Sequence, residues 1–305
     1  MSSILVVGSV GYDTISTPKG QRSNILGGSA NYFSFAASLY APVRVVGVVG
    51  DDYQEEHREW LRSRNVDITG LQKVHGRTFS WEGRYEKDMN EAITLATHLN
   101  VFENFHPAIP ENYRSSEVVF LANIDPVLQL QVLEQVKNPS LIAADTMDYW
   151  IRSKRDDLMR VLKSIHILLI NEGELRQLTG NWNTIAAAKE VLKMGPKAVV
   201  IKRGEYGFVM FDQESYFILP AFPIENVVDP TGAGDTFAGG FLGSLAQKGG
   251  QWNREDLKRA CVHGCLLASF TVQDFGVDGI RKVRRQDLDS RVEAYKGVIS
   301  YPQLG

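Results

Sequence analysis

The feature that most constrains the fold of this chain is a series of short, continuous apolar runs separated by longer stretches with helical periodicity. These runs are rich in Val, Ile and Leu and do not alternate with polar residues, so each predicts a strand covered on both faces. Strands of this kind form parallel sheets whose crossover connections are helices. The predicted strands span residues 4–7, 43–49, 118–122, 141–144, 166–170 and 198–201, and the predicted helices between them span residues 32–39, 53–64, 126–136, 154–162 and 184–192. This alternation predicts a doubly wound α/β fold, with a mostly parallel sheet and helices on both faces.

The C-terminal part of the chain follows a different pattern. We predict a hairpin from residues 207–211 and 216–219, and then two long helices over residues 234–247 and 254–272. We interpret residues 1–305 as one α/β domain.

Two segments do not fit the alternation, at about residues 12–26 and 77–101. The first is polar and extended, and the second predicts two or three short strands on which Phe79, Trp81 and Tyr85 share one face. Because such segments can pair although they are distant in sequence, we predict that they form a small β-sheet lid. The alternative is a pair of surface excursions packed on the core.

Charge and composition exclude several classes of function. The chain has 33 Lys and Arg against 36 Asp and Glu, a net charge of −3, without the basic stripe of a nucleic-acid or anionic-membrane surface. No apolar run reaches the length of about 18 residues that a membrane span needs, and no secretory signal begins the chain, so we predict a cytoplasmic protein. Cys261, Cys265 and the intervening His263 are too few for a closed zinc site, and buried packing is the expected role of both thiols.

The most informative segment is DPTGAGDTFAGGF at residues 229–241. Gly232, Ala233 and Gly234 permit a tight turn with uncovered amides, and the apolar spacing that follows predicts a helix. A helix N-terminus with free amides binds anions, and Asp235 in its first turn adds a carboxylate, as phosphoryl transfer to an alcohol requires. We expect the amides to keep Asp235 ionised and weakly basic. The alternative is an ordinary glycine-rich helix start capped by Asp235, although no GxxxxGK[ST] loop competes for a phosphate.

Residues 229–242 resemble the C-terminal signature of the ribokinase/PfkB-like family of carbohydrate and nucleoside kinases. Further similarities follow in the same order along the chain: Gly11 with Asp13, the pair Gly27–Gly28 before a helix, NEGE at residues 171–174, and a strand that ends at Gly204. The resemblance implies a ribokinase-like fold, ATP as the phosphoryl donor, and a lid that closes over an alcohol substrate.

The resemblance also implies roles for the acceptor side of the site. Asp235 is the expected catalytic base, and the amides of the preceding turn form the expected anion hole. Asp13 would bind substrate hydroxyls, because a carboxylate can accept two hydrogen bonds from a vicinal diol. Gly27 and Gly28 would let the backbone approach the same ligand. The alternative for Asp13 is a turn-forming residue.

On the donor side, Asn171 and Glu174 match the family's NxxE motif, which organises Mg²⁺ and its waters near the nucleotide phosphates. One carboxylate and one amide suit a hard cation that retains water. A solvated carboxylate in the first turn of a helix is the alternative for Glu174. Asp229 and Thr231 lie where relatives bind a monovalent cation, so the resemblance implies potassium stimulation.

Four positions depart from the family pattern or extend it. Asn31 stands one residue before the position where the family has its asparagine, and Tyr32 occupies that position. A one-residue shift rotates a helical side chain by about 100°. We therefore expect either Asn31 or Tyr32, but not both, to make the asparagine's contact with the substrate.

The strand that ends at Gly204 lies near the nucleotide in relatives, so Asn171, Lys202 and Gly204 are expected nucleotide-binding residues. Lys202 could offer a positive charge to the ATP phosphates, or it could be a surface lysine. His263 could stack on adenine, or it could be a satisfied core histidine.

The sequence therefore predicts an ATP-dependent kinase of a primary alcohol in a small sugar or sugar derivative. A nucleoside of the adenosine or inosine type is an alternative acceptor, because Phe79, Trp81 and Tyr85 could stack on a base. A non-catalytic metabolite sensor is the alternative from another class of protein. The open edges of a small lid sheet could also pair between two copies, which allows a homodimer.

Overall fold

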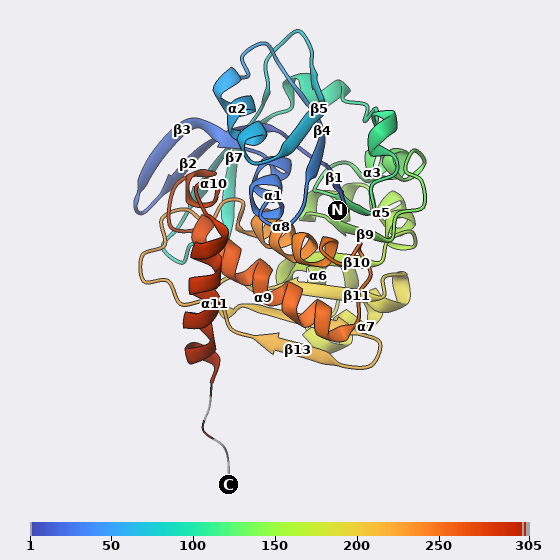
Figure 1. Ribbon diagram of the computed structural model, residues 1–305, viewed down its shortest axis with the longest axis vertical. Coiled ribbons are helices and arrows are strands. Elements are labelled where there is room, and N and C mark those ends of the chain that lie inside the picture. Colours follow the sequence, from blue (N-terminus) through green and yellow to red (C-terminus); the bar gives the residue numbers. More distant parts are fainter. Residues whose placement is uncertain (1, 301, 303–305) are drawn as a thin grey trace.

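The computed structural model describes residues 2–300 and residue 302. The main sheet contains β1 (Ile4–Val7), β4 (Val43–Val49), β5 (Val66–Lys73), β8 (Val118–Leu121), β9 (Leu141–Asp145), β10 (Ile167–Asn171), β11 (Ala198–Lys202), β12 (Phe208–Asp212) and β13 (Tyr216–Leu219). Within the described residues these nine strands lie in the order β13-β12-β11-β10-β9-β8-β1-β4-β5 (Figure 1). All neighbours from β11 to β5 pair in parallel, whereas β12 and β13 form an antiparallel hairpin at one edge. The predicted doubly wound, mostly parallel sheet is confirmed.

Both faces of this sheet are buried, which explains the continuous apolar runs. Ile4 and Val6 pack into one hydrophobic core, and Leu5 and Val7 pack into a second core on the opposite face. The first core receives apolar residues from α1 (Ser29–Ala37), α2 (Glu55–Ser63), α8 (Ala233–Ala246), α9 (Arg254–Thr271), α10 (Asp278–Arg281) and α11 (Arg285–Ile299). The second receives them from α3 (Pro126–Leu133), α4 (Asp148–Ser153), α5 (Arg155–Leu162), α6 (Glu172–Thr179) and α7 (Thr184–Met194).

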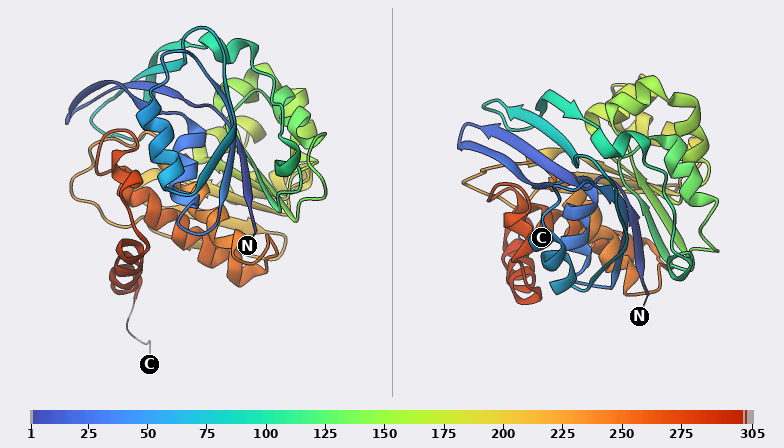
Figure 2. Two further views of the ribbon diagram at one scale, coloured as in Figure 1. Left: turned by 45° about the horizontal axis from the view of Figure 1, so that its top comes forward. Right: turned by 90° about the horizontal axis from the view of Figure 1, so that it is seen from above.

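A second, smaller sheet projects beyond one end of the main sheet (Figure 2). It is made of β2 (Gly11–Thr17), β3 (Gly20–Gly27), β6 (Phe79–Tyr85) and β7 (Ala92–His98), in the order β3-β2-β6-β7. We call it the lid sheet. Its central strands β2 and β6 pair in parallel, so the two predicted lid segments meet directly.

One face of the lid sheet carries an apolar cluster. Ile15, Tyr85 and Phe275 are its buried members, and Trp81 packs against them. Phe79 does not join this cluster, because its ring packs against Phe102 with the ring centroids 5.6 Å apart. The three aromatic residues stand at odd-numbered positions of β6, as the prediction of one shared face requires, but only Trp81 and Tyr85 join the apolar cluster.

The strand β5 was not predicted. Its sequence VDITGLQK begins with alternating buried and exposed residues, because β5 is the edge strand of the main sheet and its outward side chains meet solvent. Cys261 and Cys265 are free and buried, as expected. None of the described helices combines the length and apolar character needed to cross a bilayer.

Candidate active site

The candidate active site lies where the carboxyl ends of three parallel strands meet the N-terminus of α8. Asp145 ends β9, Asn171 ends β10 and Lys202 ends β11. Ligands of open α/β sheets bind at this edge, because loops and helix N-termini converge there. The lid sheet continues directly from β1 through β2, so it contributes residues to the same region.

The turn before α8 has the shape expected of an anion site. Gly232 caps the helix in a left-handed conformation with φ at 73°, which favours glycine. The amide of Ala233 donates to the Pro230 carbonyl over 3.1 Å. Among the described residues, the amides of Gly232 and Gly234 have no hydrogen-bond partner. The predicted set of three free amides is therefore reduced to two, because the turn itself uses Ala233.

Asp235 lies in the first turn of α8 and is partly exposed. Burial and the nearby charge of Asp145 raise the pKa of Asp235 to about 7, while the Lys202 ammonium acts in the opposite direction. The expectation of a weakly basic carboxylate considered the helix amides alone, whereas burial and the Asp145 charge act in the opposite direction. A carboxylate with a pKa near the working pH is well matched to accept a proton from an alcohol.

Lys202 and Asp145 form an ion pair over the anion turn. The Lys202 Nζ lies 3.0 Å from Asp145 Oδ2, and both side chains are largely buried. The same ammonium would lie 3.1 Å from a β-carbon on Gly234, so it lies directly beside the anion turn. Lys202 is therefore a residue of the site rather than a surface lysine. Sequence reasoning missed Asp145, although a single acidic residue directly after a buried strand was a usable signal.

The NEGE segment forms a reciprocal cap at the start of α6. Asn171 Oδ1 accepts a hydrogen bond of 2.8 Å from the Glu174 amide, and Glu174 Oε2 accepts one of 2.9 Å from the Asn171 amide. The cap fixes the Glu174 carboxylate beside Asp145. Burial and the Asp145 charge raise the pKa of Glu174 to about 8, whereas Lys202 lowers it.

The paired carboxylates Asp145 and Glu174 fit a magnesium ion. Mg²⁺ prefers oxygen ligands and is bound through one or two carboxylates together with substrate phosphates. Two carboxylates that repel each other beside an anion turn match that requirement. No cluster of three or more His, Cys, Asp or Glu residues suited to a metal occurs within the part of the chain that the structure describes, so phosphate oxygens and water would complete the shell.

The acceptor side of the site is built around Asp13 on β2. Its side chain is 4% exposed, and burial together with the charges of Asp229 and Asp235 raises the pKa of Asp13 to about 8. A β-carbon on Gly27 would lie 1.9 Å from Asp13 Oδ2, so only glycine leaves room for this carboxylate. Gly28 has φ at 91° and caps α1, which requires glycine for its conformation.

Asn31 and Tyr32 both lie at this side of the site. Asn31 is fully buried, and its Nδ2 donates to the Gly27 carbonyl over 2.6 Å. The Tyr32 ring lies against Gly232, where a β-carbon would approach Cδ1 to 2.3 Å. The N-terminus of α1 therefore places Asn31 against the glycine pair and Tyr32 against the anion turn, and which of the two serves the substrate contact stays a prediction.

Asp229 holds the backbone around the anion turn. It is fully buried, its Oδ1 accepts from the Thr231 amide and its Oδ2 accepts from the Gly276 amide, each over 2.9 Å. The Thr231 hydroxyl donates to the Tyr85 hydroxyl over 3.1 Å. These contacts connect the anion turn to the lid sheet.

Two predicted nucleotide-binding residues have other surroundings. His263 lies on α9, and its Nδ1 hydrogen-bonds the Tyr40 hydroxyl over 2.7 Å. Burial and the charges of Arg285 and Arg259 lower the pKa of His263 to about 4, which agrees with the alternative of a satisfied, hydrogen-bonded histidine. Gly204 is exposed with φ at 54°, and Asn90 of the β6–β7 loop lies over it.

Comparisons with known proteins agree with this geometry. Residues 1–282 match a family model described as pfkB family carbohydrate kinase. The cytidine kinase of Thermococcus kodakarensis is 33% identical over 256 residues, which are 81% of this chain and 90% of that protein. The solved structure of Burkholderia thailandensis nucleoside kinase in complex with inosine matches with a TM-score of 0.79 at 19% identity, over 98% of this chain and 100% of that one. An E. coli structure described as a Ribokinase II in complex with ATP and Mg²⁺ matches with a TM-score of 0.80 at 20% identity, over 96% and 100%.

Proposed function

Because this chain belongs to the pfkB family of carbohydrate kinases, we propose that it transfers the terminal phosphoryl group of ATP to the primary hydroxyl of a ribonucleoside. Cytidine is the first candidate acceptor, since a relative that shares a third of its residues is a cytidine kinase. The observation that carries this proposal is the placement of Asp235 beside the free amides of Gly232 and Gly234. Asp13 lies close enough to Asp235 for the charge of Asp235 to contribute to the raised pKa of Asp13.

The lid sheet supports a nucleoside as the acceptor. Asp13 and Ile15 are two residues apart on β2, so their side chains share a face. The apolar cluster of Ile15, Tyr85 and Phe275, with Trp81 against it, therefore lies beside the carboxylate that would hold the ribose. An aromatic surface next to a diol-binding carboxylate suits a base attached to a sugar. A small sugar is the second candidate, because Asp13 and the Gly27–Gly28 turn can bind a diol without a base.

The chemistry follows from the positions of the charged groups. Asp13 accepts hydrogen bonds from the ribose diol and orients the primary hydroxyl toward Asp235. Asp235 takes the hydroxyl proton as the new O–P bond forms and the bond between the γ-phosphorus and the leaving ADP oxygen breaks. The amides of Gly232 and Gly234 and the Lys202 ammonium stabilise the charge on the transferring group.

Asp145 and Glu174 would hold Mg²⁺, which when bound neutralises the phosphate charges of ATP. E. coli Ribokinase II with ATP and Mg²⁺ supports this choice of donor and ion. We also propose that potassium stimulates the enzyme by binding at the loop of Asp229 and Thr231. We propose a homodimer that forms through the exposed strand β7, where Leu95 is 57% exposed. We further propose a cytoplasmic location, where ATP is supplied.

The test is ADP formation from ATP with MgCl₂ and KCl across cytidine, uridine, adenosine, inosine, ribose and fructose. We expect the highest kcat/KM with a ribonucleoside. Turnover of ribose or fructose alone would replace the nucleoside proposal with the sugar proposal. Tight binding of one acceptor without ADP formation would instead favour a metabolite sensor. Replacing KCl by NaCl tests potassium stimulation.

A further inference from the structure

Tyr32 carries a buried hydroxyl that the fold does not satisfy. The residue is 1% exposed, and its Oη has no hydrogen-bond partner among the described residues. Buried hydroxyl groups are nearly always hydrogen-bonded, because an unpaired one loses its interaction with water. A ligand that completes this hydrogen bond would explain the position of the group.

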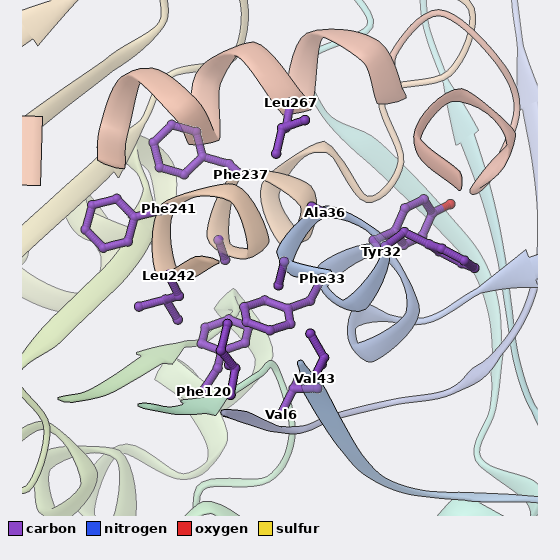
Figure 3. Close-up of a cluster of buried hydrophobic side chains, with 14 of the residues drawn as sticks. Val6, Tyr32, Phe33, Ala36, Val43, Phe120, Phe237, Phe241, Leu242 and Leu267 are labelled. Atoms are coloured by element: carbon purple, nitrogen blue, oxygen red, sulfur yellow. The ribbon is translucent and has the colours of Figure 1, made fainter. Parts of the chain in front are cut away.

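The hydroxyl faces the reacting groups rather than the core. The ring lies against Gly232 of the anion turn. Figure 3 shows that the hydroxyl points away from the neighbouring cluster of Phe33, Phe237 and Leu267. Burial and then the charges of Asp13, Asp229 and Asp235 raise the pKa of Tyr32 well above its usual value, so the phenol keeps its proton at physiological pH.

The acceptor site needs a neutral donor in this position. The pKa of Asp13 is raised to about 8 in the free site, and a hydroxyl that donates to this carboxylate favours its ionised form. An ionised carboxylate only accepts hydrogen bonds, so the bound ribose hydroxyl still has lone pairs to satisfy. The Asn31 amide nitrogen already donates to the Gly27 carbonyl, and the Lys202 ammonium is paired with Asp145 on the phosphate side. The Tyr32 hydroxyl keeps its proton and lies beside the anion turn, so it can donate to a ribose hydroxyl that itself donates to Asp13.

We propose that Tyr32 donates a hydrogen bond to a ribose hydroxyl held by Asp13 and thereby makes this site selective for ribonucleosides over deoxyribonucleosides. The inference rests on the proposed function for the class of acceptor. A site that hydrogen-bonds a substrate hydroxyl rejects the analogue that lacks it, because the buried partner is then left unpaired. Tyr32 therefore acts as a specificity-determining residue.

The test is the binding of cytidine, 2′-deoxycytidine and 3′-deoxycytidine, measured by calorimetry with the whole chain, for wild type, Tyr32→Phe and Tyr113→Phe. Tyr113 is a control outside the site: it is a fully buried tyrosine that packs in the second core on the opposite face of the main sheet. We expect Tyr32→Phe to weaken cytidine binding by about 10-fold to 100-fold. For the deoxycytidine that lacks the hydroxyl contacted by Tyr32, the affinity of Tyr32→Phe should equal that of wild type. Tyr113→Phe should change none of the three affinities.

Equal weakening of all three ligands, or no change for cytidine, would overturn the inference. Thermal unfolding separates these results from misfolding, since Tyr32→Phe loses an unpartnered buried hydroxyl and should be at least as stable as wild type. Cytidine binding without phosphorylation would refute the proposed function, but the affinities of wild type and Tyr32→Phe would still show whether Tyr32 contacts a ribose hydroxyl. A wild-type protein that does not bind cytidine would overturn the role of Tyr32 in ribonucleoside selection.

Discussion

Replacing Lys202 by methionine removes the ammonium that opposes the pKa shift of Asp235. In the structure this ammonium lies 3.0 Å from Asp145 and 3.1 Å from the β-carbon position of Gly234, the residue before Asp235. An opposite charge within about 4–6 Å lowers the pKa of a carboxyl by about one to three. The pKa of Asp235 is raised to about 7 with Lys202 present, so its loss should raise that pKa further.

The sign of the effect on activity follows from the role of Asp235 as a base. The carboxylate must be ionised, so kcat/KM falls about tenfold per pH unit below its pKa. We expect the acid limb of the wild-type pH profile to have its midpoint near pH 7 and that of Lys202→Met to lie about one to three pH units higher. The assay is kcat/KM between pH 5 and pH 10.

The matched control is Lys189→Met, which removes an exposed lysine on α7 and should leave the profile unchanged. A Lys202→Met enzyme with lower activity but an unmoved acid limb would show that Lys202 binds phosphate without setting the ionisation of Asp235. A midpoint that moves to lower pH would refute the electrostatic reasoning altogether.

Three further substitutions test other contacts of the site. Asp235→Asn should reduce kcat by about 10²-fold to 10⁴-fold and leave ATP binding nearly intact, and near-normal turnover would remove the residue from its role as base. Gly27→Ala should raise KM for the acceptor much more than KM for ATP, because the new methyl carbon would lie 1.9 Å from Asp13 Oδ2; an effect confined to ATP would place the acceptor elsewhere. Tyr85→Phe removes the 3.1 Å hydrogen bond to Thr231 and should lower kcat/KM by about tenfold, the equivalent of one hydrogen bond of about 1–1.5 kcal/mol, and unchanged kinetics would show that this contact does not position the anion turn.

Much of the fold could be predicted because burial on both faces leaves a direct mark on the sequence. The bounds of β1, β4 and β13 were predicted to the residue. The edge strand β5 was not, because one of its faces meets solvent and its apolar run is broken by Asp67 and Thr69. The continuous-run criterion therefore identifies interior parallel strands and misses a strand with one open face.

The site was predictable where it is encoded locally. The segment from Asp229 to Asp235 contains its own turn and helix start, so its anion-binding geometry could be inferred from the residues alone. The ion pair of Asp145 with Lys202 joins positions 57 residues apart, and it depends on the order of β9, β10 and β11 in the sheet. The two alternatives for His263 could not be separated for a similar reason, since its contact with Tyr40 depends on how α9 packs beside the end of α1.

The central position of β1 has a consequence for how this protein must be made. β1 leaves the ribosome before the other strands of the main sheet, yet it lies between β4 and β8, and β8 begins only at residue 118. Until then one edge of β1 stays open, with backbone groups available to any other strand. A nascent chain with an unfinished parallel sheet folds slowly and is exposed to misassembly. Slow translation before residue 118 would therefore prolong the period in which this chain depends on a chaperone.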